Sequence, residues 1–389
     1  MKRVNIIVLG LLFSLSMMAG TPKFSVLTCY PGDEAYSLYG HTGLRYCDEE
    51  KGLDIVFNYG YFDFDAPHFI WRFVRGETDY MVGAVSYDVF CREYMNRGSL
   101  IVGDVLELTP EQENELFELL RENCRPENRV YRYNYFYNNC TTKIRDLVER
   151  VTGGVEYDAA PGYATFRDAL NDLLENHPWY AFGINLMLGA DIDRPASVRD
   201  LQFVPMNYME NLSKAYVTGE NGERDRLSTV RNMTIPETED SPAVHSNFTP
   251  FNVALLLLLA TFVVMLCEVR KIKSFWAFDV LIMSMQGLAG CVLLFMALFS
   301  QHPAVGNNWL LILLNPLALV LIPVYVYRMR KRRSMSVAWV QVAMVVAFLV
   351  SAACGVQVYP LPVYFCAVAL MVRSLFLIYK ENICELSRF

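Results

Sequence analysis

The chain has 389 residues, 53% of them hydrophobic, and a formal net charge of -7. This length and apolar content exclude a single small domain and an ordinary soluble protein. Residues 251–389 hold 11 Lys and Arg against 4 Asp and Glu, whereas the first 250 residues hold 23 and 37. We therefore predict an acidic, polar N-terminal half that is joined to a membrane domain.

The N-terminus has the pattern of a secretory signal peptide over residues 1–20. Two basic residues precede an apolar run over residues 4–18, and the small pair Ala19-Gly20 follows this run. An uncleaved membrane anchor is the alternative. The first cysteine, Cys29, lies well beyond the apolar run, so we do not interpret the chain itself as a lipoprotein.

Short strands and polar turns are predicted after the signal peptide. The β-branched and aromatic residues indicate strands over residues 24–29, 37–46, 53–60, 80–85, 100–108 and 129–137. The second and third of these form a hairpin signal. If its turn is centred near residue 50, His41 lies almost opposite Asn58, within cross-strand reach. Asn58 could then orient the His41 imidazole.

Helices are predicted between and after these strands. The segment 109–123 has strong start signals, because Thr109 is a good N-cap and Pro110 fits the first helical position. Further helices are expected over residues 164–175, 179–188 and 207–217. The apolar segment 179–188 either belongs to a core or rests on the bilayer surface. We interpret residues 220–250, which are polar and rich in Pro, as a linker.

Residues 69–76 combine aromatic and basic side chains. One interpretation is a core helix with two solvated arginines. The other is that Arg45, Arg72 or Arg75 binds a phosphate head group, because a guanidinium can bind phosphate oxygens through paired hydrogen bonds. The sequence leaves both interpretations open.

The most informative stretch is an aromatic run, residues 133–139, that ends at Cys140. The apolar spacing after Cys140 is helical, and Asn139 is a good N-cap, so Cys140 lies at a helix N-terminus. The helix dipole and unpaired amides favour a thiolate there, and the same amides could hold an oxyanion. Cys140 is therefore the candidate nucleophile and His41 the candidate base. A buried packing cysteine and a satisfied core histidine are the alternatives.

The other histidines and cysteines are weaker candidates. His68 and His177 compete as the base, but each adjoins a proline, in a turn or at a helix end. An odd number of cysteines in the N-terminal half leaves one unpaired. The other four either form up to two disulfides or stay as free buried thiols: Cys29, Cys47, Cys91 and Cys124.

Five apolar runs near the C-terminus are long enough to cross a bilayer. They cover about residues 251–267, 278–300, 309–327, 337–353 and 358–379. Basic residues cluster at 270–273 and 328–333, and the alternate loops, residues 301–308 and 355–357, lack Lys and Arg. The positive-inside rule therefore places the N-terminal half outside and the C-terminus inside. Gln286 and Asn315-Pro316 within the spans face either neighbouring helices or a lipid-facing groove.

The order of these features resembles a known family. A strand with His, a strand with a polar residue and a later Cys at a helix start are similar to the circularly permuted NlpC/P60 branch of the papain-like fold. More closely, three motifs followed by five spans resemble the Bacteroides-type lipoprotein N-acyltransferase family over essentially the whole chain: Gly40-His41-Thr42-Gly43-Leu44-Arg45, Asn58-Tyr59-Gly60 and Asn138-Asn139-Cys140-Thr141-Thr142.

The resemblance implies an α+β, permuted papain-like catalytic domain over residues 21–219 and a helical transmembrane domain over residues 251–389. The catalytic domain would face the periplasm from the inner membrane, with the C-terminus in the cytoplasm. The enzyme would move a fatty acyl chain from a membrane phospholipid, through a thioester on Cys140, to the α-amino group of a diacylglyceryl-modified lipoprotein.

The resemblance also assigns roles to individual residues. Cys140 would be the nucleophile, His41 the base and Asn58 the third, polar member, a position that varies in papain-like proteins. Substrate contacts are expected from Tyr39, Arg45, Arg72, Arg75 and Asn139. Neither a metal nor another cofactor is expected, and no nucleic-acid partner.

Three other functions stay open on the residues alone. A membrane-tethered cysteine peptidase or amidase of cell-wall peptides would use the same Cys/His pair, although it needs no group of spans. A phospholipase-like thiol hydrolase would pass the acyl group to water. A non-catalytic binding or scaffolding protein would keep Cys140 as a structural residue.

Overall fold

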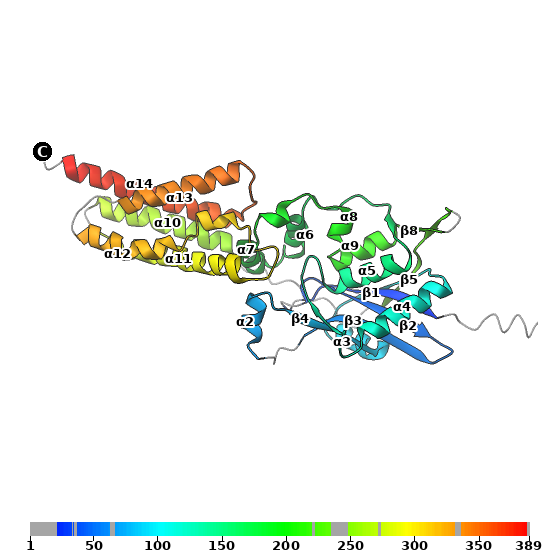
Figure 1. Ribbon diagram of the computed structural model, residues 1–389. Coiled ribbons are helices and arrows are strands. Elements are labelled where there is room, and N and C mark those ends of the chain that lie inside the picture. The colour runs from blue at the N-terminus through cyan, green and yellow to red at the C-terminus, as the bar shows by residue number, and fades with distance from the viewer. Residues whose placement is uncertain are drawn as a thin grey trace, which may run out of the picture. The chain divides into compact units, whose positions relative to one another are not determined.

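The computed structural model describes residues 22–32, 34, 37–62, 67–219, 222–234, 248–270, 274–330 and 336–386. The predicted signal peptide lies outside these residues. The chain forms two compact units, whose elements are labelled in Figure 1. The second unit contains residues 70–76, 170–195 and the described residues from 248 onward, and the first unit contains the remainder.

A seven-stranded antiparallel sheet is the centre of the first unit (Figure 1), with the strand order β10-β5-β1-β2-β3-β4-β6. A smaller sheet has the order β7-β8-β9. The strands are β1 Lys23–Cys29, β2 His41–Asp48, β3 Leu53–Tyr61, β4 Asp79–Ser86, β5 Ile101–Leu106, β6 Val130–Arg132, β7 Glu156–Tyr157, β8 Ala215–Thr218, β9 Arg224–Arg226 and β10 Ser228–Thr234.

Helices cover both faces of the large sheet, so the middle of β1 and of β3 is buried on both sides. On one face, side chains from three helices form the main core with alternate residues of β1, β2 and β3. These helices are α4 Pro110–Asn123, α5 Cys140–Val151 and α9 Pro205–Leu212. On the other face, α3 Tyr87–Asn96 contributes Phe90 and Tyr94 to a second core cluster.

The predicted hairpin of β2 and β3 is present, with a small difference in register. Gly43 is the residue opposite Asn58, so His41, the first residue of β2, lies two positions before the residue that pairs directly with Asn58. Such diagonal neighbours on one face are still within reach of long side chains. The hairpin therefore brings His41 and Asn58 together as predicted.

Three segments differ from the prediction. Residues 129–137 were expected as one strand, but β6 ends at Arg132, and the Asn134 side chain then accepts hydrogen bonds from the amides of Phe136 and Tyr137. This Asx turn is formed by an aromatic run whose composition favours a strand. Helix α3 has no counterpart among the predicted elements, and the helix expected over 207–217 ends at Leu212, before β8.

The segment 220–250 is more than the predicted linker. Its described part contains β9 and β10, and β10 is an edge strand that pairs with β5. Most β10 side chains are exposed, which explains why the sequence shows no buried pattern there. Residues 235–247 of the predicted linker lie outside the described residues.

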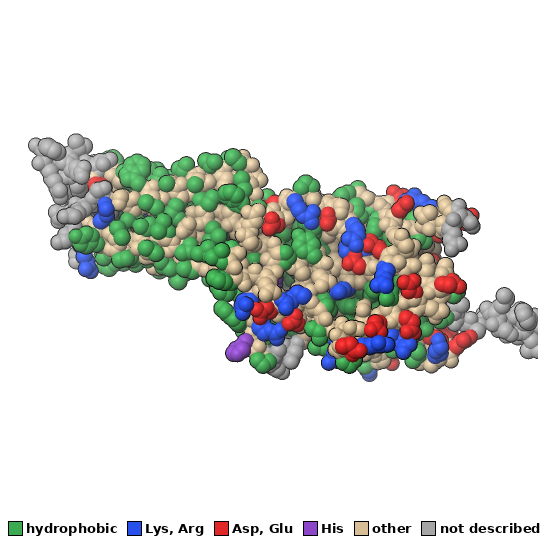
Figure 2. Space-filling view, in the orientation of Figure 1, with side chains coloured by type: hydrophobic (Ala, Val, Ile, Leu, Met, Phe, Trp, Pro, Cys, Tyr) green, Lys and Arg blue, Asp and Glu red, His purple; other side chains and the backbone are tan. Residues whose placement is uncertain are grey.

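The second unit contains five helices that are long and apolar enough to cross a membrane. Their bounds agree with the predicted spans to within three residues, except that the last helix continues seven residues further: α10 Pro250–Val269, α11 Trp276–Phe299, Trp309–Arg330 (η2 Trp309–Ile312 and α12 Leu317–Arg330), α13 Ser336–Ala353 and α14 Leu361–Leu386. Figure 2 shows hydrophobic side chains over most of their visible surface. The chain thus combines a mixed α and β unit with apolar candidate transmembrane helices.

Two short helices of the N-terminal half also belong to the second unit. These are α2 Phe69–Val74 and α7 Pro178–Met187. Phe182 and Leu186 of α7 pack against the core of the apolar helices, so the apolar segment 179–188 contributes to a core. Helix α6, Phe166–Leu173, crosses the boundary between the units in sequence.

The polar residues inside the spans contact neighbouring helices. The Gln286 and Gln341 amides exchange two hydrogen bonds, of 3.1 and 2.9 Å. Gly290 allows close packing, because a Cβ there would lie 2.6 Å from the carbonyl carbon of Asn315. These contacts favour the structural interpretation of Gln286 and of Asn315-Pro316, since buried amides in lipid need partners.

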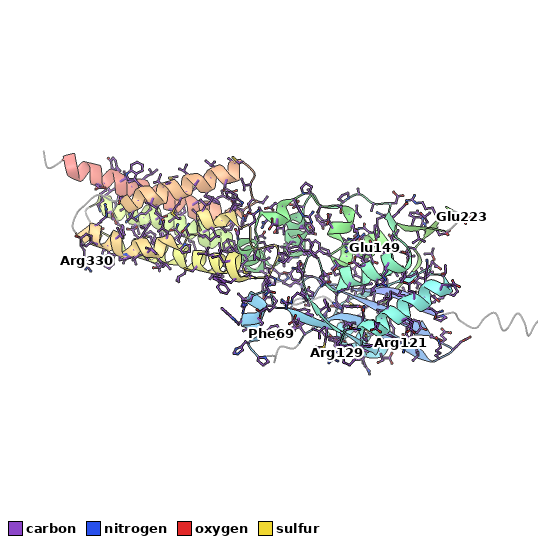
Figure 3. All side chains as sticks on the ribbon, in the orientation of Figure 1. Phe69, Arg121, Arg129, Glu149, Glu223 and Arg330 are labelled. Carbon is purple, nitrogen blue, oxygen red and sulfur yellow. The ribbon has the colours of Figure 1, made fainter. Side chains whose placement is uncertain are left out.

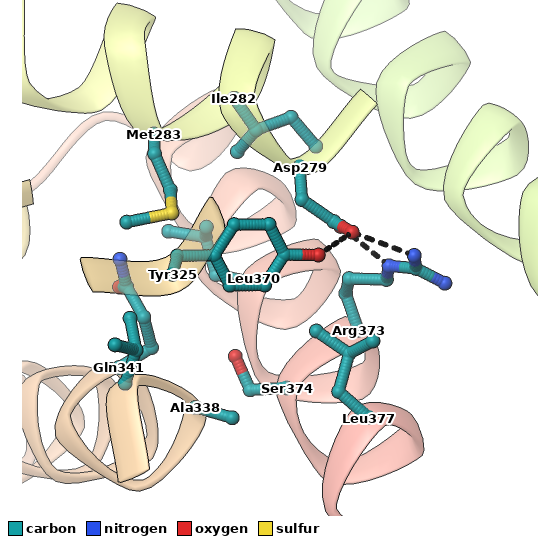
Figure 4. Close-up of a pocket in the computed structure, with 11 residues that line it drawn as sticks. Asp279, Ile282, Met283, Tyr325, Ala338, Gln341, Leu370, Arg373, Ser374 and Leu377 are labelled. Carbon is teal, nitrogen blue, oxygen red and sulfur yellow. Dashed lines mark hydrogen bonds and ion pairs between the residues drawn. The ribbon is translucent and has the colours of Figure 1, made fainter. Parts of the chain in front are cut away.

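A buried network of charged and polar side chains joins four of the spans. Arg373 of α14 donates to Asp279 of α11 at 2.6 and 2.8 Å, and to Glu268 of α10 at 2.8 Å. The Tyr325 hydroxyl donates to Asp279 at 2.5 Å, as Figure 4 shows. Lys380 completes the network with a 2.8 Å ion pair to Glu268. Because the side chains of Arg373, Asp279 and Glu268 are almost wholly buried, each charge depends on the others.

We predict that Arg373→Leu strongly destabilises the second unit. The change leaves the buried Asp279 carboxylate without its cation and Glu268 with Lys380 alone, a loss of about 3–5 kcal/mol for a buried pair. Thermal unfolding of the detergent-solubilised full chain measures the effect. The triple variant Arg373→Leu/Asp279→Asn/Glu268→Gln should recover part of the lost stability, and a triple variant no more stable than the single one contradicts the electrostatic cause.

Candidate active site

Helix α5 places Cys140 at its first residue. The Asn139 side chain caps the helix: its oxygen accepts from the Thr142 amide, and the Thr142 hydroxyl bonds back to the Asn139 amide. The side-chain nitrogen of Asn139, Nδ2, also donates to the backbone carbonyls of Tyr135 and Phe203, at 2.9 and 2.7 Å. All polar atoms of this side chain are thus used within the protein, and they fix the position of Cys140.

Packing and ion pairs hold α5 against the rest of the first unit. Its apolar face is buried in the main core. On its polar side, Arg199 pairs with Asp146 and with Glu149, which Figure 3 labels. Arg145 donates to the Arg199 carbonyl at 2.9 Å. The segment of α8, Val198–Leu201, is therefore tied to α5.

His41 lies between Asn58 and Cys140. Its Nε2 is 2.6 Å from the Asn58 side-chain oxygen. Because this oxygen only accepts hydrogen bonds, Nε2 carries the proton. The remaining ring nitrogen, Nδ1, is then the one available to accept a proton from Cys140, whose charge acts to raise the pKa of His41. Asn58 thus selects the tautomer in which the imidazole can act as a base toward Cys140.

The electrostatics of the pair favour the thiolate. Burial alone would raise the pKa of Cys140, but the charge and hydrogen bond of His41, with smaller help from Thr42 and Thr141, lower it to about 7. For His41, burial acts to lower the pKa, and the charge and hydrogen bond of Cys140 outweigh it, so that the pKa is raised. Both shifts favour a thiolate–imidazolium pair at neutral pH.

Several side chains support the pair although the sequence assigned them no role. The Thr42 hydroxyl lies 2.9 Å from that of Thr141, which itself lies 3.8 Å from the Cys140 sulfur. Tyr94 of α3 stacks on the His41 ring at 5.7 Å. The two threonines fall inside the motifs around His41 and Cys140, so the sequence contained their signal, whereas α3 was not predicted at all.

Tyr61 and Gly60 shape the surroundings of His41 and Asn58. Burial raises the pKa of Tyr61, and the neighbouring Asn58 side chain opposes the rise. Gly60 has φ +116°, and a Cβ there would lie 3.6 Å from the His41 ring. A side chain at position 60 would therefore be strained and would touch the imidazole.

The predicted substrate contacts are spread over the chain. Tyr39 packs on Tyr135 with ring centres 4.7 Å apart, within the aromatic residues near Cys140. Arg45 forms a two-bond ion pair with Asp54, at 2.7 Å for each bond, and lies four residues along β2 from His41, about 13 Å away. Arg72 and Arg75, at the C-terminal end of α2 and just after it, belong to the second unit. Their contact with substrate stays a prediction.

The competing histidines and possible disulfides can also be placed. His68 is exposed, and His177 precedes α7 in the second unit, so His41 is the histidine that the fold joins to Cys140. All nine cysteines that the structure describes are free thiols. Among the described residues, no three His, Cys, Asp or Glu side chains are grouped so that they could hold a metal ion.

Comparison of the sequence with models of known protein families shows which family the chain belongs to. The model of the Lnb N-terminal periplasmic domain matches residues 16–172, and that of the Lnb transmembrane domain matches residues 241–382. The two matches lie in the order of the two halves and cover roughly three quarters of the chain. The chain belongs to the Lnb-type lipoprotein N-acyltransferase family. No curated protein and no solved structure matches it.

Membership of the Lnb family settles the broad organisation. The protein is a lipoprotein-processing membrane enzyme with a periplasmic N-terminal domain and five transmembrane helices. The residues around Cys140 lie within the range matched by the periplasmic domain. The permuted NlpC/P60 connection stays an interpretation based on the order of His41, Asn58 and Cys140.

We predict that the rate at which iodoacetamide alkylates Cys140 rises with pH and reaches half of its maximum at the thiol pKa of about 7. His41→Ala removes the main group that opposes burial, which moves the thiol pKa to its usual value of 9.0 or above and lowers the rate at pH 7 by about fifty-fold or more. The rate is measured by mass spectrometry of the Cys140 peptide. Cys29 provides an internal control, because burial raises its pKa well above the usual value and it should stay unlabelled. Equal rates in both proteins would contradict the pairing.

We predict a smaller effect of the same kind for Asn58→Ala. The variant keeps the imidazole but loses the 2.6 Å bond that orients it. Hydrogen bonds to charged groups contribute about 1.5–3 kcal/mol, so the alkylation rate at pH 7 should fall about tenfold or more. Tyr61→Phe, which removes only the hydroxyl that supports Asn58, should lie between wild type and Asn58→Ala. A Tyr61→Phe rate below that of Asn58→Ala would contradict this order of support.

Proposed function

We propose that the protein is a thiol-dependent acyltransferase that completes lipoprotein N-termini. It takes a fatty acyl chain from a membrane phospholipid onto Cys140 and transfers the chain to the α-amino group of a diacylglyceryl-cysteine. The observation that carries the proposal is the Cys140–His41–Asn58 arrangement, with its lowered thiol pKa, in a chain that has five transmembrane helices.

In the first half-reaction the Cys140 thiolate attacks the ester carbonyl carbon of the phospholipid. We expect the oxyanion that forms to be stabilised by backbone amides at the start of α5 that the Asn139 cap does not use. When the carbon–oxygen bond breaks, the His41 imidazolium gives its Nδ1 proton to the departing oxygen of the lysophospholipid. A thioester on Cys140 and a neutral His41 remain.

In the second half-reaction the neutral amine of the lipoprotein attacks the thioester carbonyl. His41 Nδ1 accepts a proton from the nitrogen, and the carbon–sulfur bond breaks. The products are an amide on the lipoprotein and the regenerated thiolate–imidazolium pair. The same histidine thus serves as acid in one step and as base in the next, which its raised pKa suits.

Two further features favour transfer to a lipid-anchored amine over a soluble reaction. Donor and acceptor are both anchored in the bilayer, so an enzyme with transmembrane helices meets them at high effective concentration. Cys140 retains only 8% exposure, and it lies close enough to Tyr135 for its charge to act on that side chain, so we expect water to reach a thioester poorly. A hydrolase needs the opposite, a site open to water.

We predict that deletion of the gene leaves lipoproteins with a free α-amino group. Mass spectrometry of a lipoprotein N-terminal peptide should show the loss of one fatty acyl chain. Wild type and Cys124→Ala, which changes a free cysteine at the end of α4, should restore the chain, whereas Cys140→Ala should not. An unchanged N-terminus in the deletion strain removes the transferase function and favours the peptidase.

The purified protein separates transfer from hydrolysis. Phospholipid is supplied with and without a diacylglyceryl peptide that has a free amine. The proposal predicts acylated peptide in amounts that match the lysophospholipid released. Release of free fatty acid at the same rate with or without the peptide would identify a phospholipase-like hydrolase instead.

A further inference from the structure

Helix α2 exposes large apolar side chains. The exposed fractions are 78% for Ile70, 53% for Trp71 and 46% for Phe73. Three large apolar residues at this exposure within four positions of one helix form a patch of a kind that marks an interaction site. The helix belongs to the unit of the apolar spans, not to the unit that contains Cys140.

Hydrogen bonds fix α2 at the end of a span. Ser300 and Gln301 follow α11 directly, and they donate to the carbonyls of Val74 and Arg75 at 2.9 and 2.7 Å. Gly76 permits this approach: it has φ +72°, and a Cβ there would lie 2.7 Å from the His302 nitrogen. The position of α2 relative to α11 is thus set by backbone contacts that a side chain at residue 76 would block.

The apolar patch of α2 continues the apolar surface of α11. The Trp71 ring lies 5.2 Å from that of Phe295, and Phe295 lies 5.4 Å from Phe299. Phe299 and Leu298 are 60% and 64% exposed, as expected for lipid-facing residues of a span. Because the N-terminal domain is periplasmic and α10 crosses first, the end of α11 at Phe299 lies on the periplasmic side.

We propose that α2 lies in the membrane–water interface of the periplasmic leaflet, with Ile70, Trp71 and Phe73 among the lipids. The occupant of the patch is the bilayer, because the patch is continuous with the lipid-facing side of α11. Trp is typical of this depth, and the nearby Arg72 and Arg75 are suited to the head-group level. The inference does not depend on the chemistry proposed for Cys140.

The placement of α2 in the interface also affects the path of the chain after β3, the strand that contains Asn58. In sequence, β3 ends at Tyr61, and α2 begins eight residues later, at Phe69. The chain that supplies the residue orienting His41 therefore enters the lipid interface and returns as β4. A lipid-facing segment is inserted into the catalytic half of the chain itself, separate from the five spans.

Fluorescence quenching in nanodiscs tests this placement. The full-length wild type is compared with Trp71→Phe, which keeps the aromatic contact with Phe295, so the difference between the two signals isolates Trp71 from the other four tryptophans. We expect lipids brominated near the glycerol end of the acyl chain to quench the Trp71 signal about twofold more than lipids brominated near the methyl end, because interfacial helices lie shallowly. Aqueous iodide should have little effect.

A matched control places a tryptophan on the other unit. Val130 of β6 is 52% exposed, so Val130→Trp in the Trp71→Phe background should be quenched by iodide and not by brominated lipid. The proposal is overturned if the Trp71 signal behaves like this control, which would indicate an exposed periplasmic surface. It is equally overturned if neither quencher acts, which would indicate that another protein segment covers Trp71.

Discussion

The contact between the first turn of α5 and the start of β2 is the constraint on which the site depends. His41 and Cys140 are 99 residues apart, and local structure cannot bring them together. The Thr42–Thr141 hydrogen bond joins the residue after His41 to the residue after Cys140. The apolar side chains that follow this turn in α5 are buried, and each large one contributes about 1.5–3 kcal/mol to the stability of the fold. Their burial fixes the position of the helix on the sheet.

Burial and charge act in opposite directions at Cys140, and their balance gives the thiol its character. A buried thiol without a partner resists ionisation, as the raised pKa of Cys29 shows in the same unit. At Cys140 the imidazole of His41 reverses this effect, because the same low polarity that penalises a lone charge strengthens the attraction within a pair. A nearly dry site can therefore still produce a nucleophile, which is the condition that aminolysis of a thioester requires.

Much of this arrangement could be predicted from the sequence where the signal is local. The polar turn set the hairpin that brings His41 near Asn58, Asn139 marked the start of α5, and hydropathy located all five apolar helices. The elements that were predicted wrongly or not at all are those whose conformation depends on tertiary contacts. The Asx turn at Asn134 interrupts an aromatic run that favours a strand, and β10 is an edge strand whose side chains are mostly exposed. Tyr94 reaches His41 only through α3, which was not predicted.

The boundary between the halves is also less simple in three dimensions than in sequence. The acidic N-terminal half supplies α2 and α7 to the unit of the spans. Beyond α7, the amides of Gly189 and Ala190 donate to the carbonyls of Ala304 and Asn307, and a Cβ at Gly189 would lie 2.4 Å from the Asn307 oxygen. The loop after α11 is thus packed against backbone that precedes the first span. A fragment ending at residue 250 would keep His41, Asn58 and Cys140, yet it would separate α2 and α7 from the helices that they contact. The unit of the apolar helices is therefore complete only when the periplasmic half contributes these segments, so the two halves of the sequence are not two independent pieces of structure.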